Sequence, residues 1–102
     1  MPHPRQTIDE KTKSKIIAVI SALMPDVKIY LFGSRARGTN SPSADIDIAL
    51  DGGKELPVAD VDEIKGMFKE SNIMYKIDVV DFHSITDLMR REILQERKIW
   101  KQ

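Results

Sequence analysis

The sequence predicts a small α/β domain, of the α+β kind, in which helices pack on a mixed β-sheet. Three short runs of β-branched, aliphatic and aromatic residues predict strands, and segments with apolar residues at helical spacing lie between and beside them. Strands and helices that alternate in this way form layers around one core. The length of 102 residues suits one domain, so we predict a single domain over residues 1–102 with a flexible tail at residues 1–6.

The first predicted helix follows the proline-containing tail. Thr7 and Glu10 have the spacing of a capping box, in which a hydroxyl and a carboxylate accept hydrogen bonds from free amides at a helix start. Apolar residues then recur at helical spacing, namely Ile16, Val19, Ile20 and Leu23. Pro25 is expected to end the helix near Met24, because proline disfavours helical geometry in the residue before it.

Val27–Phe32 is the first predicted strand, since it is short and rich in β-branched and aromatic residues. It runs directly into Gly33 and Ser34, where we expect a short helix that includes the basic segment 35–38. Residues 39–43 are rich in turn-forming side chains and predict a loop.

The second predicted strand, Ala44–Leu50, alternates acidic and aliphatic residues. Asp45 and Asp47 share one face of the strand, because residues two apart project to the same side. The opposite face consists of Ile46, Ile48 and Leu50. We therefore expect the aliphatic face to lie in the core.

The rest of the chain predicts a helix, a third strand and a final helix. Pro57 opens the first of these helices, whose apolar residues are Val58, Val61, Ile64, Met67 and Phe68. Tyr75–Val80 is the third predicted strand, and Asp78 is its only acid. Residues 84–87 have the pattern of a helix cap, and the final helix is expected to carry Leu88, Met89, Ile93, Ile99 and Trp100.

Composition narrows the classes of function. Sixteen basic residues balance sixteen acidic ones, so net charge gives no general attraction to nucleic acid, and contacts with phosphates must come from a local cluster. The chain has no cysteine, which excludes disulfides and thiolate metal sites and suits an intracellular protein. No apolar run approaches the roughly 20 residues that span a bilayer, and no signal-peptide pattern opens the chain. We therefore expect a cytoplasmic protein without membrane contacts.

Gly33 and Ser34 are candidate phosphate-binding residues. A glycine at a strand end lets a phosphate approach the backbone, and a serine at a helix start offers a hydroxyl and an amide to an anion. Arg35 and Arg37 add cationic groups beside this turn, where they would neutralise charge on a leaving group. The alternative is an ordinary strand-to-helix turn with a serine cap and solvated arginines.

Asp45 and Asp47 are candidate metal ligands. Two carboxylates on one strand face repel each other, partial burial increases that cost, and a divalent cation such as Mg²⁺ or Mn²⁺ removes it. If the third strand lies beside the second, Asp78 joins them, and three carboxylates then hold two ions in the arrangement used for phosphoryl and nucleotidyl transfer. The alternatives are solvated acids on an edge strand and, for Asp78, an exposed carboxylate beside Lys76.

The combined pattern resembles the signature of the DNA polymerase beta nucleotidyltransferase superfamily. Gly33-Ser34, ten intervening residues, Asp45-Ile-Asp47 and a later lone Asp78 have its spacing. The run FGSRARGTNSPSADIDIAL is similar to the core of its minimal nucleotidyltransferases, and the similarity extends from Ile16 to the final helix. It implies a polymerase-beta-like fold, triphosphate binding at Ser34, and a catalytic, metal-binding triad made by the three aspartates.

Many minimal members resemble antitoxins that silence HEPN-type ribonuclease toxins by adding AMP to them. The resemblance implies an Mg²⁺-dependent enzyme with two metal ions that transfers AMP from ATP, or another nucleotide from its triphosphate, to a hydroxyl of a helical HEPN-type partner and releases pyrophosphate. Larger members have extra domains that grip nucleic acid or complete an antibiotic pocket, and 102 residues leave no room for these. We therefore expect the acceptor on a second protein.

Two other functions stay open at this point. One is a non-catalytic, nucleotide-binding antitoxin that acts by docking to its partner. The other is the catalytic subunit of a small-molecule (antibiotic) nucleotidyltransferase whose pocket is completed by a separate helical subunit. The sequence does not name the acceptor, the nucleotide base or the oligomeric state.

Overall fold

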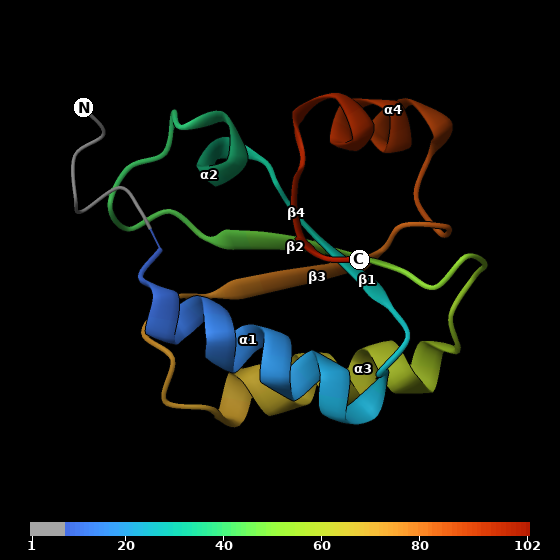
Figure 1. Ribbon diagram of the computed structural model, residues 1–102, viewed down its shortest axis with the longest axis horizontal. Coiled ribbons are helices and arrows are strands. Elements are labelled where there is room, and N and C mark those ends of the chain that lie inside the picture. The colour runs from blue at the N-terminus through green and yellow to red at the C-terminus, as the bar shows by residue number, and fades with distance from the viewer. Residues whose placement is uncertain (1–7) are drawn as a thin grey trace.

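The computed structural model describes residues 8–102, so the predicted tail and the Thr7 half of the predicted capping box lie outside the described residues. The elements are, in chain order, α1 (Glu10–Leu23), β1 (Lys28–Phe32), α2 (Ser34–Arg37), β2 (Ile46–Asp51), α3 (Val58–Glu70), β3 (Ile77–Asp81), α4 (Asp87–Glu96) and β4 (Lys98–Lys101) (Figure 1). Every element expected from the sequence is present, and one additional strand, β4, follows the final helix.

The strands within residues 8–102 form one mixed sheet in the order β3-β2-β1-β4. β1 is antiparallel to both β2 and β4, whereas β2 and β3 are parallel. α3 makes the crossover that a parallel pair requires. The predicted fold class, a small mixed sheet with helices packed on it, is confirmed.

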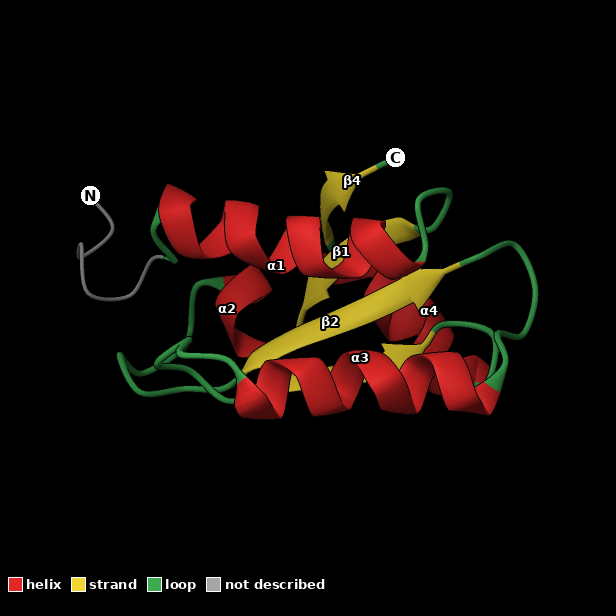
Figure 2. Cartoon of the chain, turned by 90° about the horizontal axis from the view of Figure 1, so that it is seen from below, coloured by secondary structure: helices red, strands yellow, loops and turns green. Residues whose placement is uncertain are grey.

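The two faces of the sheet pack against different helices. α1 and α3 lie side by side over one face (Figures 1 and 2), and the main core fills the space between them and the strands. Its fully buried side chains are Ile16, Ile20, Ile29, Ile46, Ile48, Leu50 and Ile64. α4 lies over the opposite face, where Tyr30, Phe32, Ala49, Phe82 and Ile93 form a smaller cluster. α2 follows β1 directly, at one end of the sheet.

The predicted faces of the second strand are confirmed. Ile46, Ile48 and Leu50 are fully buried in the main core, so Asp47 and Asp51 project from the α4 face. Burial of one aliphatic side chain contributes about 1.5–3 kcal/mol. The register of β2 is therefore strongly fixed, because a shift by one residue would bring carboxylates into the core.

The final helix is shorter than we predicted. α4 ends at Glu96, and Ile99 and Trp100, which we expected on this helix, lie in β4. β4 pairs with the edge of β1 that β2 leaves open. A four-residue segment is too short for its apolar spacing to separate helix from strand, so this pairing decides its structure. Trp100 is partly buried against the main core.

The helix caps also differ in detail from the prediction. Within the predicted cap at residues 84–87, Thr86 is the capping residue, because its Oγ1 accepts a hydrogen bond from the Met89 amide at 3.2 Å. The Ser84 hydroxyl instead donates to the Asp81 carboxylate at 2.8 Å. At α1 the cap position is held by Asp9, whose side chain makes no capping hydrogen bond.

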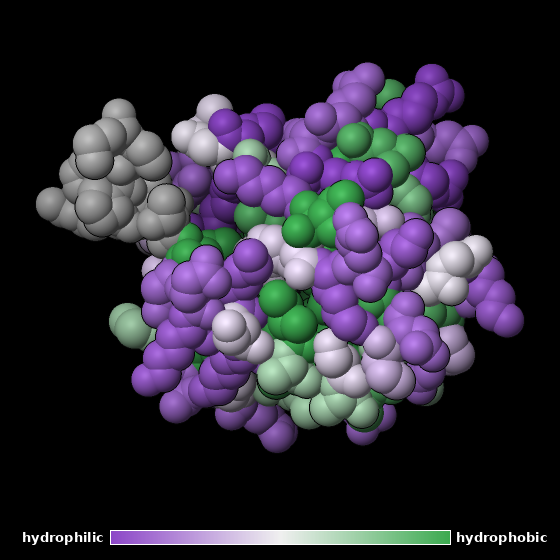
Figure 3. Space-filling model, in the orientation of Figure 1, coloured by the Kyte–Doolittle hydropathy of each residue, from purple (hydrophilic) through white to green (hydrophobic). Residues whose placement is uncertain are grey.

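The surface in the view of Figure 3 is mostly hydrophilic, with small separate hydrophobic areas. Large apolar side chains that remain exposed on α4 and β4 are Leu88, Leu94 and Ile99. Within residues 8–102, each helix is too short or too polar to cross a bilayer.

Candidate active site

The candidate site lies where β1 ends and β2 begins. Phe32, the last residue of β1, is the register partner of Asp47, so Gly33 follows directly beside this carboxylate. Asp47 is also the register partner of Asp78 in the parallel β2–β3 pair. Because paired residues of neighbouring strands project to the same face of a sheet, Asp78 shares the face of Asp47. Asp45 precedes β2 and lies close enough to act electrostatically on Asp47.

Gly33 brings the backbone close to these acids. Its φ is 77°, a conformation that residues with a side chain rarely adopt. A Cβ at this position would lie 2.4 Å from Oδ2 of Asp47. The backbone conformation therefore requires glycine here, and a side chain would also displace the Asp47 carboxylate. Ser34 follows as the first residue of α2 and is partly buried.

Several acidic side chains surround Asp47. Partial burial raises the pKa of Asp47, and the charges of Asp78, Asp45 and Glu96 raise it further, whereas Arg37 opposes them. A carboxyl group held back from ionisation by neighbouring acids in a cleft marks a candidate functional site. A divalent cation between these acids would remove the repulsion.

The acids are not gathered around one point. Within residues 8–102, no three acidic or histidine side chains are already arranged to hold a metal ion. The Asp78 side chain is 45% exposed, and its Oδ1 lies 3.8 Å from Nζ of Lys76. Asp78 and Asp47 are nevertheless register partners, so their side chains project from neighbouring positions on one face of the sheet. Their oxygen donors suit Mg²⁺ or Mn²⁺.

We had expected Arg35 to extend outward towards a phosphate, but its side chain is directed inward. It is 5% exposed, and its Nε and Nη2 donate to the carbonyl of Ala44 at 3.0 and 2.9 Å. Nη2 also donates to the carbonyl of Pro42 at 3.1 Å, and the guanidinium carbon lies 4.7 Å from the ring centroid of Tyr75. We interpret Arg35 as a residue that positions the loop before Asp45.

Arg37 lies at the surface, with 49% of its side chain exposed. Its Nη1 donates to Oε2 of Glu96 at 2.8 Å. Oε1 of the same carboxylate accepts a hydrogen bond from the Gly33 amide at 3.0 Å. Glu96 was not predicted as a site residue, because an acid on an amphipathic helix gives no local sign that it contacts a residue 63 positions away.

A cavity of about 970 Å³ opens beside the acids along β3. Asp47 and Asp78 line it together with the apolar side chains of Phe32 and Met89 and with Lys65 of α3. Pockets of roughly 300–1,000 Å³ bind small ligands and cofactors. The cavity therefore has the size to receive a nucleotide next to the acids.

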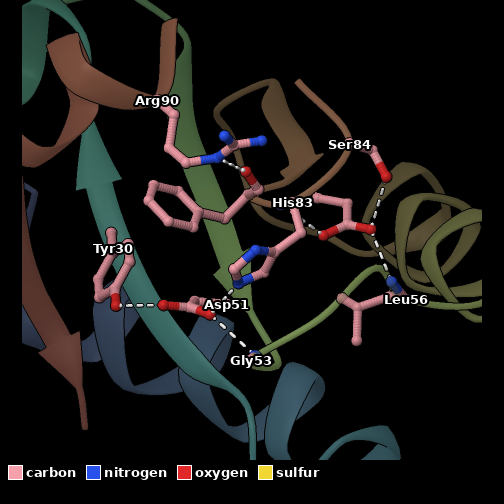
Figure 4. A network of polar contacts seen from close by, with 9 residues as sticks. Tyr30, Asp51, Gly53, Leu56, His83, Ser84 and Arg90 are labelled. Carbon is pink, nitrogen blue, oxygen red and sulfur yellow. Dashed lines mark hydrogen bonds and ion pairs between the residues drawn. The ribbon is translucent and has the colours of Figure 1, made fainter. Parts of the chain in front are cut away.

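A second polar network lies at the other end of β2 (Figure 4). The Asp51 carboxylate accepts a hydrogen bond from the Tyr30 hydroxyl at 2.7 Å and lies 2.7 Å from Nε2 of His83. Burial alone would raise the pKa of Asp51, but hydrogen bonds from Tyr30, Gly53 and His83 outweigh burial and lower it. Burial and the adjacent Asp51 raise the pKa of Tyr30. We assign this network to stability, because it links β1, β2 and the turn after β3 without the site residues.

A mixed sheet that sets a glycine-serine turn beside acids of two neighbouring strands is the architecture of a nucleotidyltransferase domain. Comparison with known proteins agrees with this class. The family described as "Polymerase beta, Nucleotidyltransferase" matches residues 14–101. The chain therefore belongs to the polymerase beta nucleotidyltransferase family, and the resemblance seen in its motifs is confirmed.

Individual relatives agree with this assignment. The chain is 28% identical over 92 residues to "Probable protein adenylyltransferase MntA" of Haemophilus influenzae, covering 86% of this chain and 78% of that protein. A crystal structure of a toxin-antitoxin with AMP-PNP superposes with a TM-score of 0.73 at 28% identity, covering 86% of this chain and 71% of that chain. A structure of tri-AMPylated Shewanella oneidensis HEPN toxin in complex with MNT antitoxin gives a TM-score of 0.71 at 24% identity, covering 91% and 71%, and supports the fold.

Proposed function

We propose that this protein is an Mg²⁺-dependent adenylyltransferase that transfers AMP from ATP to a hydroxyl group of a helical HEPN-type partner and thereby acts as its antitoxin. Family membership supports nucleotidyl transfer, and the names of the relatives support AMP as the group and a HEPN toxin as the acceptor. The observation that carries the proposal is the register pairing of Asp47 with Asp78, with Gly33 in close approach to Asp47.

Asp45, Asp47 and Asp78 would hold the metal ions. The donor set consists of carboxylate oxygens, which suit Mg²⁺ and also Mn²⁺. The raised pKa of Asp47 supports the assignment, because it reflects partial burial first and neighbouring negative charge second, and a bound cation would offset both. When bound, two such ions would neutralise charge on the triphosphate and on the departing pyrophosphate.

The remaining residues would bind and orient the triphosphate. The amide of Gly33 and the hydroxyl and amide of Ser34 lie at the end of β1, where backbone donors suit an anion. Arg37, at the surface beside them, would neutralise charge on the leaving group. The acceptor oxygen attacks the α-phosphorus, the bond to the oxygen that bridges to the β-phosphorus breaks, and pyrophosphate leaves. Asp78 is our candidate for the group that takes the hydroxyl proton.

A second protein is the best source of the acceptor. The cavity beside Asp47 and Asp78 opens along β3, which is an edge strand of the sheet. A partner that covers this edge would complete the pocket and present its hydroxyl to the acids. Since the proposed reaction consumes ATP, we place it in the cytoplasm.

Transfer of a labelled nucleotide tests this function. The protein is mixed with a purified helical HEPN-type partner, Mg²⁺ and ATP labelled at the α-phosphate, and the label is followed on a denaturing gel. We expect label on the partner, its loss in Asp45→Asn and Asp47→Asn, and its retention in Asp26→Asn, which alters an exposed turn.

Two results would contradict the proposal. If the aspartate variants stay folded, lose labelling and still neutralise the partner fully, the protein acts by docking. If label never enters the partner but accumulates on an added antibiotic, the acceptor is a small molecule.

A further inference from the structure

Glu96 joins the end of α4 to the turn that holds Gly33. Its Oε1 accepts a hydrogen bond from the Gly33 amide at 3.0 Å, and its Oε2 accepts one from Arg37 Nη1 at 2.8 Å. The side chain is 21% exposed. One carboxylate therefore engages a backbone donor that follows β1 and a cation of α2 simultaneously.

This position is electrostatically unfavourable for an acid. Glu96 is the last residue of α4, and the last turn of this helix contains no basic residue. The C-terminus of a helix carries partial negative charge, which disfavours a carboxylate. Asp47 lies near enough for Glu96 to add to the negative field around it. The hydrogen bonds from Gly33 and Arg37 oppose these repulsions and hold the Glu96 carboxylate in this position.

The Gly33 amide and Arg37, which Glu96 holds, are among the donors that our proposed function assigns to the triphosphate. We propose that Glu96 is an internal anionic gate, whose carboxylate occupies these donors in the nucleotide-free protein and must be displaced by the triphosphate of ATP. Glu96 thereby lowers the affinity for the nucleotide. The inference rests on the proposed function, because it takes the end of β1 as the triphosphate-binding site.

Displacement requires movement of one side chain. The backbone that follows Glu96 is held by β4, which pairs with β1, and by Arg97, whose guanidinium carbon lies 4.4 Å from the ring centroid of Tyr30. The helix can therefore stay in place while the Glu96 side chain turns away. The competing role for Glu96 is to orient Arg37 towards the phosphates, and the two roles predict opposite effects of neutralisation.

Calorimetric titration with AMP-PNP and Mg²⁺ separates these roles. We expect Glu96→Gln to bind AMP-PNP about tenfold more tightly than the unaltered protein does, equivalent to about 1.4 kcal/mol. Glu96→Ala should show the same increase in affinity. Glu92→Gln, one turn earlier on the exposed face of α4, is the matched control and should bind like the unaltered protein. Adenosine, which lacks phosphates, should bind all four proteins equally.

Equal or weaker binding of AMP-PNP by a folded Glu96→Gln variant would overturn the gate, and weaker binding would assign Glu96 to the orientation of Arg37. Tighter binding of adenosine as well would also overturn it, because a gate on the triphosphate donors acts on the phosphates alone. If neither the unaltered protein nor any variant binds AMP-PNP, the proposed function itself fails. If AMP-PNP binds measurably but with an affinity that does not depend on the charge at Glu96, only the role proposed for Glu96 fails.

Discussion

The carboxylate of Asp47 occupies the space in which a side chain at Gly33 would begin. A Cβ at Gly33 would lie 2.4 Å from Oδ2 and 3.2 Å from Cγ of Asp47. The glycine of the Gly-Ser motif therefore leaves room for an acid of the Asp-x-Asp motif, in addition to any ligand. This contact joins the two motifs into one unit, so a change in either should displace the other.

Gly33→Ala should reduce the rate of nucleotidyl transfer about 100-fold without unfolding the protein. The substitution costs about 1–3 kcal/mol, because Gly33 combines φ 77° with ψ −158°, a region that is essentially restricted to glycine, and it also pushes the Asp47 carboxylate away. A displacement of about 1 Å at a reacting centre can reduce the rate on the order of 100-fold. The measurement is the rate of AMP transfer together with the free energy of unfolding in urea.

Gly38→Ala is the matched control for this prediction. Gly38 has a φ of 76°, but an added Cβ would meet no atom within 4 Å. Because Gly38 is in the left-handed region (ψ 17°), Gly38→Ala should lose about 1–2 kcal/mol of stability and keep most of its activity. Equal losses of activity in the two variants would show that the contact with Asp47 is unimportant.

Asp47→Asn should stabilise the ligand-free protein while it removes activity. Ionised Asp47 is opposed by partial burial and by the neighbouring acids, and the neutral amide avoids both effects at nearly the same volume. We expect a higher Tm at pH 7 and low salt, with about 4–8 °C for each kcal/mol gained. Asp26→Asn should leave Tm unchanged. A lower Tm for Asp47→Asn would mean that this carboxylate makes a favourable contact in the absence of metal.

Metal affinity should depend on pH because of the raised pKa of Asp47. Metal ligands must be deprotonated, so a proton on Asp47 competes with Mg²⁺ or Mn²⁺. The metal affinity should be highest above the raised pKa and should weaken as the pH falls through it. This loss should occur at a higher pH than it would for an ordinary aspartate. Titration of Mn²⁺ from pH 8 to pH 4 by calorimetry measures this. A constant affinity down to pH 4 would contradict the assignment of Asp47 as a ligand, because its pKa is raised above the ordinary value of 3.8.

Arg35→Lys should destabilise the fold, although it keeps the positive charge. A lysine cannot reproduce the forked hydrogen bonds to Ala44 and Pro42 or the stacking on Tyr75. Loss of buried hydrogen-bonding partners costs about 1–3 kcal/mol. Arg37→Lys, at the exposed neighbouring position, should change stability by no more than about 0.5 kcal/mol. If both variants were equally stable, Arg35 would have no positioning role.

Local sequence information determined much of this protein. The alternation of Ile46 and Ile48 with Asp45 and Asp47 predicted both faces of β2, because a strand has a side-chain period of two. The Gly33-Ser34 turn could be placed for a similar reason, since a β-branched strand leads directly into it. The order of the helices and strands up to α4 also follows from periodicity and breaking residues.

Tertiary structure decided which distant residues meet. The pairing of β2 with β3 placed Asp78 opposite Asp47. The segment after Glu96 pairs with the free edge of β1 as strand β4 instead of extending the helix. Packing also turned Arg35 inward and brought Glu96 to Gly33. The periodicity of a segment specifies which side of it is buried. It does not specify which neighbour covers that side, because this depends on contacts between residues far apart in the chain, which form only when the sheet assembles.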